Sequence, residues 1–207
     1  QNYPPAERAD GMILWTGGIG AAKAAPGKYT AKIKYGNDST EIAFVIKPNP
    51  VYQATEADYD AQVSFLLSVR DKFNEVQKAI KNIRTIRTQI TDLNSRVDAK
   101  SNKDLKQFAD SVSKQLTAIE EALYQTKAKS GQDVLNFPIR LNDKISGLYG
   151  VAASGQNAPS KQVREAFADL SGQANAQLVK LQKIIDTDLK QLNKMINDKQ
   201  VHVIGIK

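Results

Sequence analysis

The chain has 207 residues, of which 41% are hydrophobic and 25% are charged, a composition typical of folded rather than disordered proteins. It contains no cysteine, which excludes disulfides, thiolate metal sites and cysteine nucleophiles. Its one histidine, His202, excludes a site built from several histidines. No apolar run approaches the roughly 18 residues that a membrane-spanning helix requires.

The net charge is +7, from 29 basic and 22 acidic side chains. Every quarter of the chain contributes to this excess, whereas nucleic-acid-binding proteins usually concentrate it on one face or in one tail. We therefore do not expect nucleic-acid binding. A basic module for an acidic polymer stays open as an alternative.

Residues 1–50 have the character of β-structure. Apolar and polar side chains alternate over 29–35 and again over 40–46, and the glycine-containing segment 36–39 between them suits a reversing turn. The sequence therefore predicts a hairpin, with a short additional strand at 12–15. Three strands bury too little surface to be stable alone, so we interpret 1–50 as the end of a β-sandwich.

Residues 51–200 have helical periodicity. Thr55 and Asp58 resemble a capping box and open a helix of about 43 residues, roughly 64 Å long. Two seven-residue series predict its buried, coiled-coil-like seam. The series are Leu66, Phe73, Ile80 and Val69, Val76, Ile83, Ile90, Val97.

Three more helices are expected. The second begins near residue 103 and ends near Ser130-Gly131, the third begins at Pro138, and the last runs from about 160 to 197. Short loops favour antiparallel neighbours, so the sequence predicts a mainly α protein: an elongated up-down-up-down four-helix bundle. The β-like tail, 201–207, is expected to dock near the β segment.

The chain offers no convincing catalytic, cofactor-binding or metal-binding residues. The glycines before Lys23 lack P-loop spacing, and Ser111 and Lys114 lack the other elements of serine acyl enzymes. Neighbouring carboxylates diverge around a helix, so we expect them on solvated faces. These carboxylates are Glu120, Glu121, Asp186 and Asp188.

A few aromatic residues admit a sugar-stacking interpretation, although core or interface packing is the more common role. They are Trp15, Tyr124, Phe137 and Tyr149.

The segment between Glu75 and Asp92 is basic and contains no acidic residue. Its cations are Lys78, Lys81, Arg84 and Arg87. The simplest interpretation is that long stems cover apolar surface while the charged heads reach water or a carboxylate. The functional alternative is a docking site for an acidic protein partner.

Several runs of residues resemble a family of large exported bacterial proteins that carry a sortilin-like, Asp-box β-propeller and are often labelled glycosyl hydrolases. Among them are Gly11–Trp15, Ala25–Thr30, Glu120–Gln125 and Ser130–Asp133. The most particular is Leu135–Asn142. The resemblance implies an Ig-like segment followed by helices, located after the propeller. It transfers no catalytic residue, because any hydrolase activity is expected in the propeller.

We therefore expect a non-catalytic C-terminal interaction or spacer module, with no enzyme activity or cofactor of its own. The resemblance implies a Gram-negative, extracytoplasmic location: periplasmic, outer-membrane-associated or secreted. Partners would be the propeller, the preceding Ig-like strands and a protein docked on the bundle. The alternative is an accessory part of a carbohydrate-processing enzyme. Because the chain starts at Gln1 without a signal-peptide pattern, we expect a fragment or a processed chain.

Overall fold

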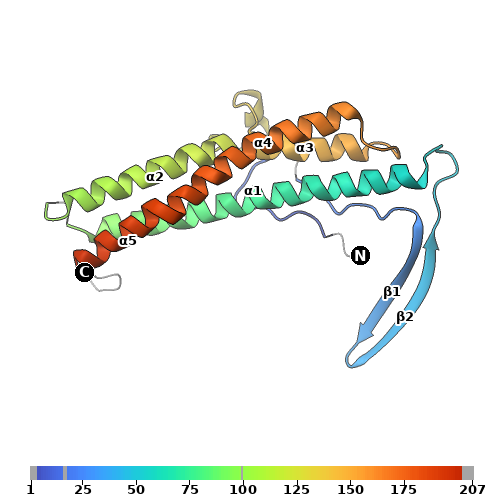
Figure 1. Ribbon diagram of the computed structural model, residues 1–207, viewed down its shortest axis with the longest axis horizontal. Coiled ribbons are helices and arrows are strands. Elements are labelled where there is room, and N and C mark those ends of the chain that lie inside the picture. The colour runs from blue at the N-terminus through green and yellow to red at the C-terminus, as the bar shows by residue number, and fades with distance from the viewer. Residues whose placement is uncertain (1–3, 16–17, 99, 202–207) are drawn as a thin grey trace.

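The computed structural model describes residues 4–15, 18–98 and 100–201. It is mainly helical, as expected, and the described residues include one two-stranded antiparallel sheet (Figure 1). The strands are β1 (Gly27–Tyr35) and β2 (Asp38–Ile46), and the helices are α1 (Glu56–Arg96), α2 (Lys103–Leu123), η1 (Gly131–Leu135), α3 (Leu141–Ala153), α4 (Lys161–Lys183), η2 (Ile184–Asp188) and α5 (Leu189–Asp198).

Helix α1 is the longest of the helices described, and its start and buried seam were predicted correctly. Thr55 caps it: the side chain accepts from the backbone of Asp58, whose carboxylate accepts from the backbone of Thr55 at 2.9 Å. All eight residues of the predicted seam are buried. At 1.5 Å per residue its 41 residues span about 61 Å. No isolated helix holds such a length, so its stability depends on the packing along it.

Helices α2 and α3 lie one after the other along α1, and both run antiparallel to it (Figure 1). Gln62, near the start of α1, donates to the carbonyl of Ala152 at the end of α3. Asn94, near the end of α1, donates to Asp110 in the first half of α2. From the start to the end of α1, the residue numbers of its contact partners therefore decrease, as expected for neighbours that run antiparallel to it. The expected alternation of directions is wrong, because α3 continues in the direction of α2.

The physical reason is the connection between α2 and α3. Helix α2 ends at Leu123, earlier than expected, where Tyr124 takes an extended conformation. Ser130 does not stop this helix and instead forms a capping box with Asp133 at the start of η1. The loop closes on itself: Gln125 Nε2 donates to the carbonyl of Pro138 at 2.8 Å. Pro138 therefore lies before α3 rather than in its first turn. The chain leaves the helices after α2 and returns to them close by, so α3 runs in the same direction as α2.

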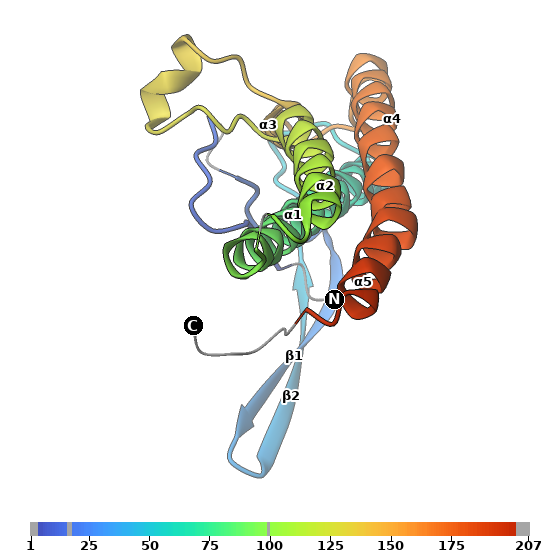
Figure 2. The ribbon, with the colours of Figure 1, turned by 90° about the vertical axis from the view of Figure 1, so that its left-hand side faces the viewer.

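The returning rod is continuous from α4 through η2, a π-helical turn, to α5. Ser160 caps its start, accepting from the backbone of Val163. The rod runs parallel to α1, since Phe65 packs edge-on against Phe167 with ring centroids 5.3 Å apart and Lys72 donates to Asn175. Figure 2 shows the resulting cross-section of α1, α2 and α4, with α3 behind α2.

The predicted hairpin is present. Tyr29 pairs with Phe44 and Tyr35 with Asp38, which leaves a two-residue loop. Gly36 has φ +58° at the first loop position, where hairpin turns of this length favour glycine. The hairpin projects away from the helices at the end where α1 begins (Figures 1 and 2).

The residues before the hairpin do not form the strand expected at 12–15. Residues 4–15, here called the N-terminal strap, lie along the helices, and Ala9 and Leu14 belong to the helical core. The helical core therefore includes residues from before residue 50, the boundary expected between the β segment and the helices. The division of the chain into domains at that boundary stays a prediction. Of the tail expected at 201–207, only Val201 lies among the described residues, packed at the edge of the core.

Candidate interaction site

The two faces of the hairpin differ in chemistry. Strand alternation puts apolar side chains on one face, here called the apolar face. These are Tyr29, Ala31, Ile33, Tyr35, Ile42, Phe44 and Ile46. The opposite face carries Lys28, Lys32 and Lys34 together with the exposed Val45, and Lys32 pairs with Glu41 across the strands at 2.9 Å.

The apolar face is largely uncovered in the structure. Only its base is closed: Tyr29 stacks on Phe44 with ring centroids 5.9 Å apart, and the Tyr29 hydroxyl donates to the carbonyl of Ala25. Toward the tip, Ile33 and Ile42 are each more than half exposed, and Tyr35 is 86% exposed. Aliphatic and aromatic side chains lined up on one face of a strand pair are the usual signature of a sheet that packs on another layer.

The basic run on α1 divides into two parts in the structure. Arg84 Nε and Arg87 Nη1 each donate to the carboxylate of Glu120 on α2 at 2.7 Å. Lys78 is exposed, and Lys81 is exposed beside Glu7 at 3.6 Å. The stem-and-carboxylate interpretation therefore describes both arginines. Docking of an acidic partner on the four residues stays a prediction, with the lysines as its exposed part.

Glu120 is where the sequence prediction of solvated carboxylates is wrong. Its side chain is buried between α1 and α2, whereas the adjacent Glu121 is exposed. The same cluster holds the N-terminal strap: Arg84 Nη1 donates to the carbonyl of Asp10, and the Arg84 guanidinium lies 5.5 Å from the centre of the Tyr124 ring. The Tyr124 hydroxyl accepts from the backbone of Ile13 at 3.0 Å.

Other polar side chains of the helices bind the strap in the same way. Gln77 on α1 accepts from the backbone of Ala9, and Asp143 on α3 accepts from the backbone of Trp15 at 2.7 Å. Both side chains are buried. Neither residue was a candidate from the sequence, although a polar residue on an otherwise apolar helix face is the available signal. These bonds replace the ladder that a strand at 12–15 would need.

The aromatic candidates do not gather into one platform. Tyr124 is buried and engaged with the strap, as core packing predicts, whereas Trp15 is more than half exposed, contrary to the expectation of a core role. Phe137 lies in the loop after η1, and Tyr149 lies on α3. These four side chains therefore do not form a single exposed surface on which a sugar could stack.

The catalytic candidates stay scattered. Ser111 and Lys114 are exposed on either side of the buried Val112, as predicted, and no helix follows Lys23, so a P-loop is absent from this region. Within the described residues, no group of three or more potential ligands is placed to hold a metal ion. Within the same residues, no helix is long and apolar enough to cross a membrane.

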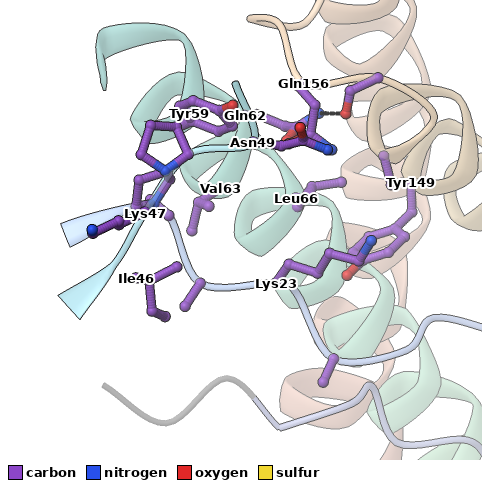
Figure 3. A pocket seen from close by; sticks show the side chains of 17 residues that line it. Lys23, Ile46, Lys47, Asn49, Tyr59, Gln62, Val63, Leu66, Tyr149 and Gln156 are labelled. Atoms are coloured by element: carbon purple, nitrogen blue, oxygen red, sulfur yellow. Dashed lines mark hydrogen bonds between the residues drawn. The ribbon is translucent and has the colours of Figure 1, made fainter. Parts of the chain in front are cut away.

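A cavity of about 330 Å³, here called the junction cavity, lies where the hairpin meets the helices (Figure 3). Val63 and Leu66 of α1 and Tyr149 of α3 supply apolar surface. Polar groups come from all four surrounding segments: Lys23, Lys47, Asn49, Tyr59, Gln62 and Gln156. Burial raises the pKa of Tyr149, with Arg70 acting in the opposite direction.

Hydrogen bonds also fix the junction next to the cavity. Asp58 accepts from the side chain and backbone of Thr55 and faces the backbone of Ala158, and these bonds hold the pKa of its carboxyl below the ordinary range. Gln62 Nε2 donates to the carbonyls of Ala152 and Gly155, both at 2.8 Å. The start of α1 and the loop after α3 are thus tied together.

No family model, curated protein or solved structure matches the chain.

Proposed function

We propose that the chain is a non-catalytic interaction and spacer module of a larger exported bacterial protein, and that its hairpin completes a β-sandwich with strands from elsewhere in the same polypeptide. The observation that supports the proposal is the uncovered apolar face of a well-formed hairpin. The resemblance to sortilin-like propeller proteins supports the Ig-like character of the sandwich and the extracytoplasmic location.

Strands fit this surface better than other occupants do. A hairpin has two open edges, whose unpaired backbone groups only another strand satisfies in a regular way. The three lysines of β1 project from the opposite face, and the charged residue that the register places on the apolar face, Asp38, lies at the tip beside Tyr35. A second layer would cover the apolar side chains, which two strands cannot bury by themselves.

A second copy of the chain is the less suitable occupant on grounds of area. Strands of nine residues are about 30 Å long, and two of them present about 300 Å² on one face. Stable dimers bury about 800 Å² per partner. Additional strands at the edges, together with a facing sheet, would supply the missing area. The helical part then holds the sandwich at one end of a rod about 61 Å long.

The test compares the isolated 22.7 kDa chain with the native protein isolated from its source. We expect a native mass well above that of the isolated chain, and slower amide exchange in β1 and β2 of the native form. Ile33→Asp with Ile42→Asp should destabilise the native form far more than the isolated chain. Thr30→Asp with Ala43→Asp, on the opposite face, is the matched control.

Two results would contradict the proposal. One is a native polypeptide of the same mass as the isolated chain. The other is equal exchange of the hairpin amides in the two forms, because strands that pair with the hairpin must protect its edges.

A further inference from the structure

The junction cavity is bounded by segments that are distant in the sequence. Residues 21–26 precede β1, residues 46–49 begin with the last residue of β2, and α1 and the end of α3 complete the walls. Figure 3 shows the side chains of these segments converging around the same space. The two carbonyl bonds of Gln62 hold one wall in place. The cavity is therefore a preformed feature, at the small end of the range that ligand sites occupy.

The cavity has many donors and no carboxylate. None of its lining residues is aspartate or glutamate, whereas Lys23 and Lys47 are both cationic. In Figure 3 the side chain of Lys23 points toward Tyr149, and that of Lys47 points away. Among the described residues, no carboxylate pairs with Lys23. A negatively charged group in the cavity would be attracted by Lys23, and the neighbouring carboxylate of Asp58 is already bonded to Thr55 and faces Ala158.

Tyr59 supplies the second, independent observation. The residue is only 5% exposed, yet its hydroxyl has no hydrogen-bond partner among the residues that the structure describes. Figure 3 shows this hydroxyl on the side of the ring that faces Gln62 and Asn49. A buried hydroxyl without a partner is costly, and an acceptor placed in the cavity would remove that cost.

We propose that the junction cavity binds a small carboxylate with an apolar body. The carboxylate accepts from the Tyr59 hydroxyl, and the apolar body packs on Val63 and Leu66. Lys23, which points toward Tyr149, adds a longer-range attraction for the negative charge. Tyr149 closes the far side. Because the cavity is formed partly by residues on both sides of the hairpin, an occupant also fixes the hairpin against the helices. This inference is independent of the function proposed above.

The test uses benzoate as the probe and benzyl alcohol as its uncharged counterpart, followed by amide NMR of the full chain. We expect saturable shifts at cavity residues with benzoate in the millimolar range and much weaker ones with benzyl alcohol. Tyr59→Phe should weaken benzoate binding about tenfold by removing one hydrogen bond to a charged group. Tyr35→Phe, at the exposed tip of the hairpin, is the matched control.

Lys23→Gln tests the charge without disturbing the fold, since the side chain is exposed. We expect roughly threefold weaker benzoate binding that is also less sensitive to salt, whereas Lys28→Gln on the hairpin should have no effect. The melting temperature gives a readout without any ligand: Tyr59→Phe should not lower it, because the lost hydroxyl has no partner.

Three outcomes would overturn the proposal. They are the absence of saturable benzoate shifts at the cavity, equal binding of benzyl alcohol, and unchanged benzoate affinity in both Tyr59→Phe and Lys23→Gln. A lowered melting temperature of Tyr59→Phe would show that the hydroxyl already has a partner, and would remove the second observation on which the proposal rests.

Discussion

Replacing Glu120 by glutamine tests how the N-terminal strap and the first two helices are held together. Glu120 is 3% exposed and accepts one bond of 2.7 Å from each of two arginines on α1. Hydrogen bonds to charged groups contribute about 1.5–3 kcal/mol each. The side chains of Arg84 and Arg87 are 34% and 38% exposed, so they regain water when the carboxylate is lost, and glutamine keeps one acceptor. We expect Glu120→Gln to cost about 2 kcal/mol.

Removing the two arginines instead should cost more, although it breaks the same two bonds. Arg84→Met with Arg87→Met leaves a carboxylate buried without a partner, for which a cost of about 3–5 kcal/mol is typical. The order of the two effects therefore reports which member of the cluster is buried. It also decides whether these arginines serve the fold or are available to an acidic partner.

Urea unfolding measures both effects as changes in the free energy of unfolding, provided that the m-value stays constant. The control is Glu165→Gln, which breaks an exposed pair with Lys161 at 3.6 Å and should change stability by less than about 0.5 kcal/mol. The reasoning is refuted if Glu120→Gln has as little effect as this control. It is equally refuted if the double arginine variant is the more stable of the two.

Two further predictions concern the core and the start of α1. Phe73→Ala should lower the free energy of unfolding by about 3–5 kcal/mol, because the ring is fully buried in the middle of the seam. Urea unfolding measures this loss. A loss below about 1 kcal/mol would show that the site collapses around the smaller side chain or is exposed. Asp58→Asn should destabilise the protein at neutral pH, and the difference should disappear at acidic pH. The pKa of Asp58 is lowered in the folded state, so its contribution is present above the unfolded pKa of about 3.9 and is lost as the pH falls through the folded pKa. A constant difference from pH 7 to pH 2, measured by thermal unfolding at about six pH values, would contradict this assignment.

The strap shows how a segment with little regular structure is held. Its backbone groups bond to side chains on two helices and to one directly after a third: Gln77 and Arg84 on α1, Asp143 on α3, and Tyr124, which follows the end of α2. Each of these bonds satisfies a backbone group that would otherwise be unpaired beside the core. The arrangement makes residues 4–15 part of the helical body rather than part of a sheet.

The local features of this fold were predictable from the sequence. The seam of α1 follows from a seven-residue spacing, its start from Thr55 and Asp58, and the hairpin from strand alternation around Gly36. In each case the deciding interaction lies within a few residues of the chain, so the pattern carries the information. The amphipathic character of the hairpin was readable in the same way, but its exposure was not.

Other features were decided only by the tertiary structure. The direction of α3 depends on how a 17-residue connection closes at Gln125, and the burial of Glu120 depends on which face of α2 meets the two arginines of α1. The strap likewise binds helix residues more than 50 positions away in the sequence, as Ala9 does with Gln77. The junction cavity is formed by segments from both sides of the hairpin and from two different helices. The periodicity of the sequence does not predict such long-range contacts, because they depend on which apolar surfaces remain to be covered once the helices have formed.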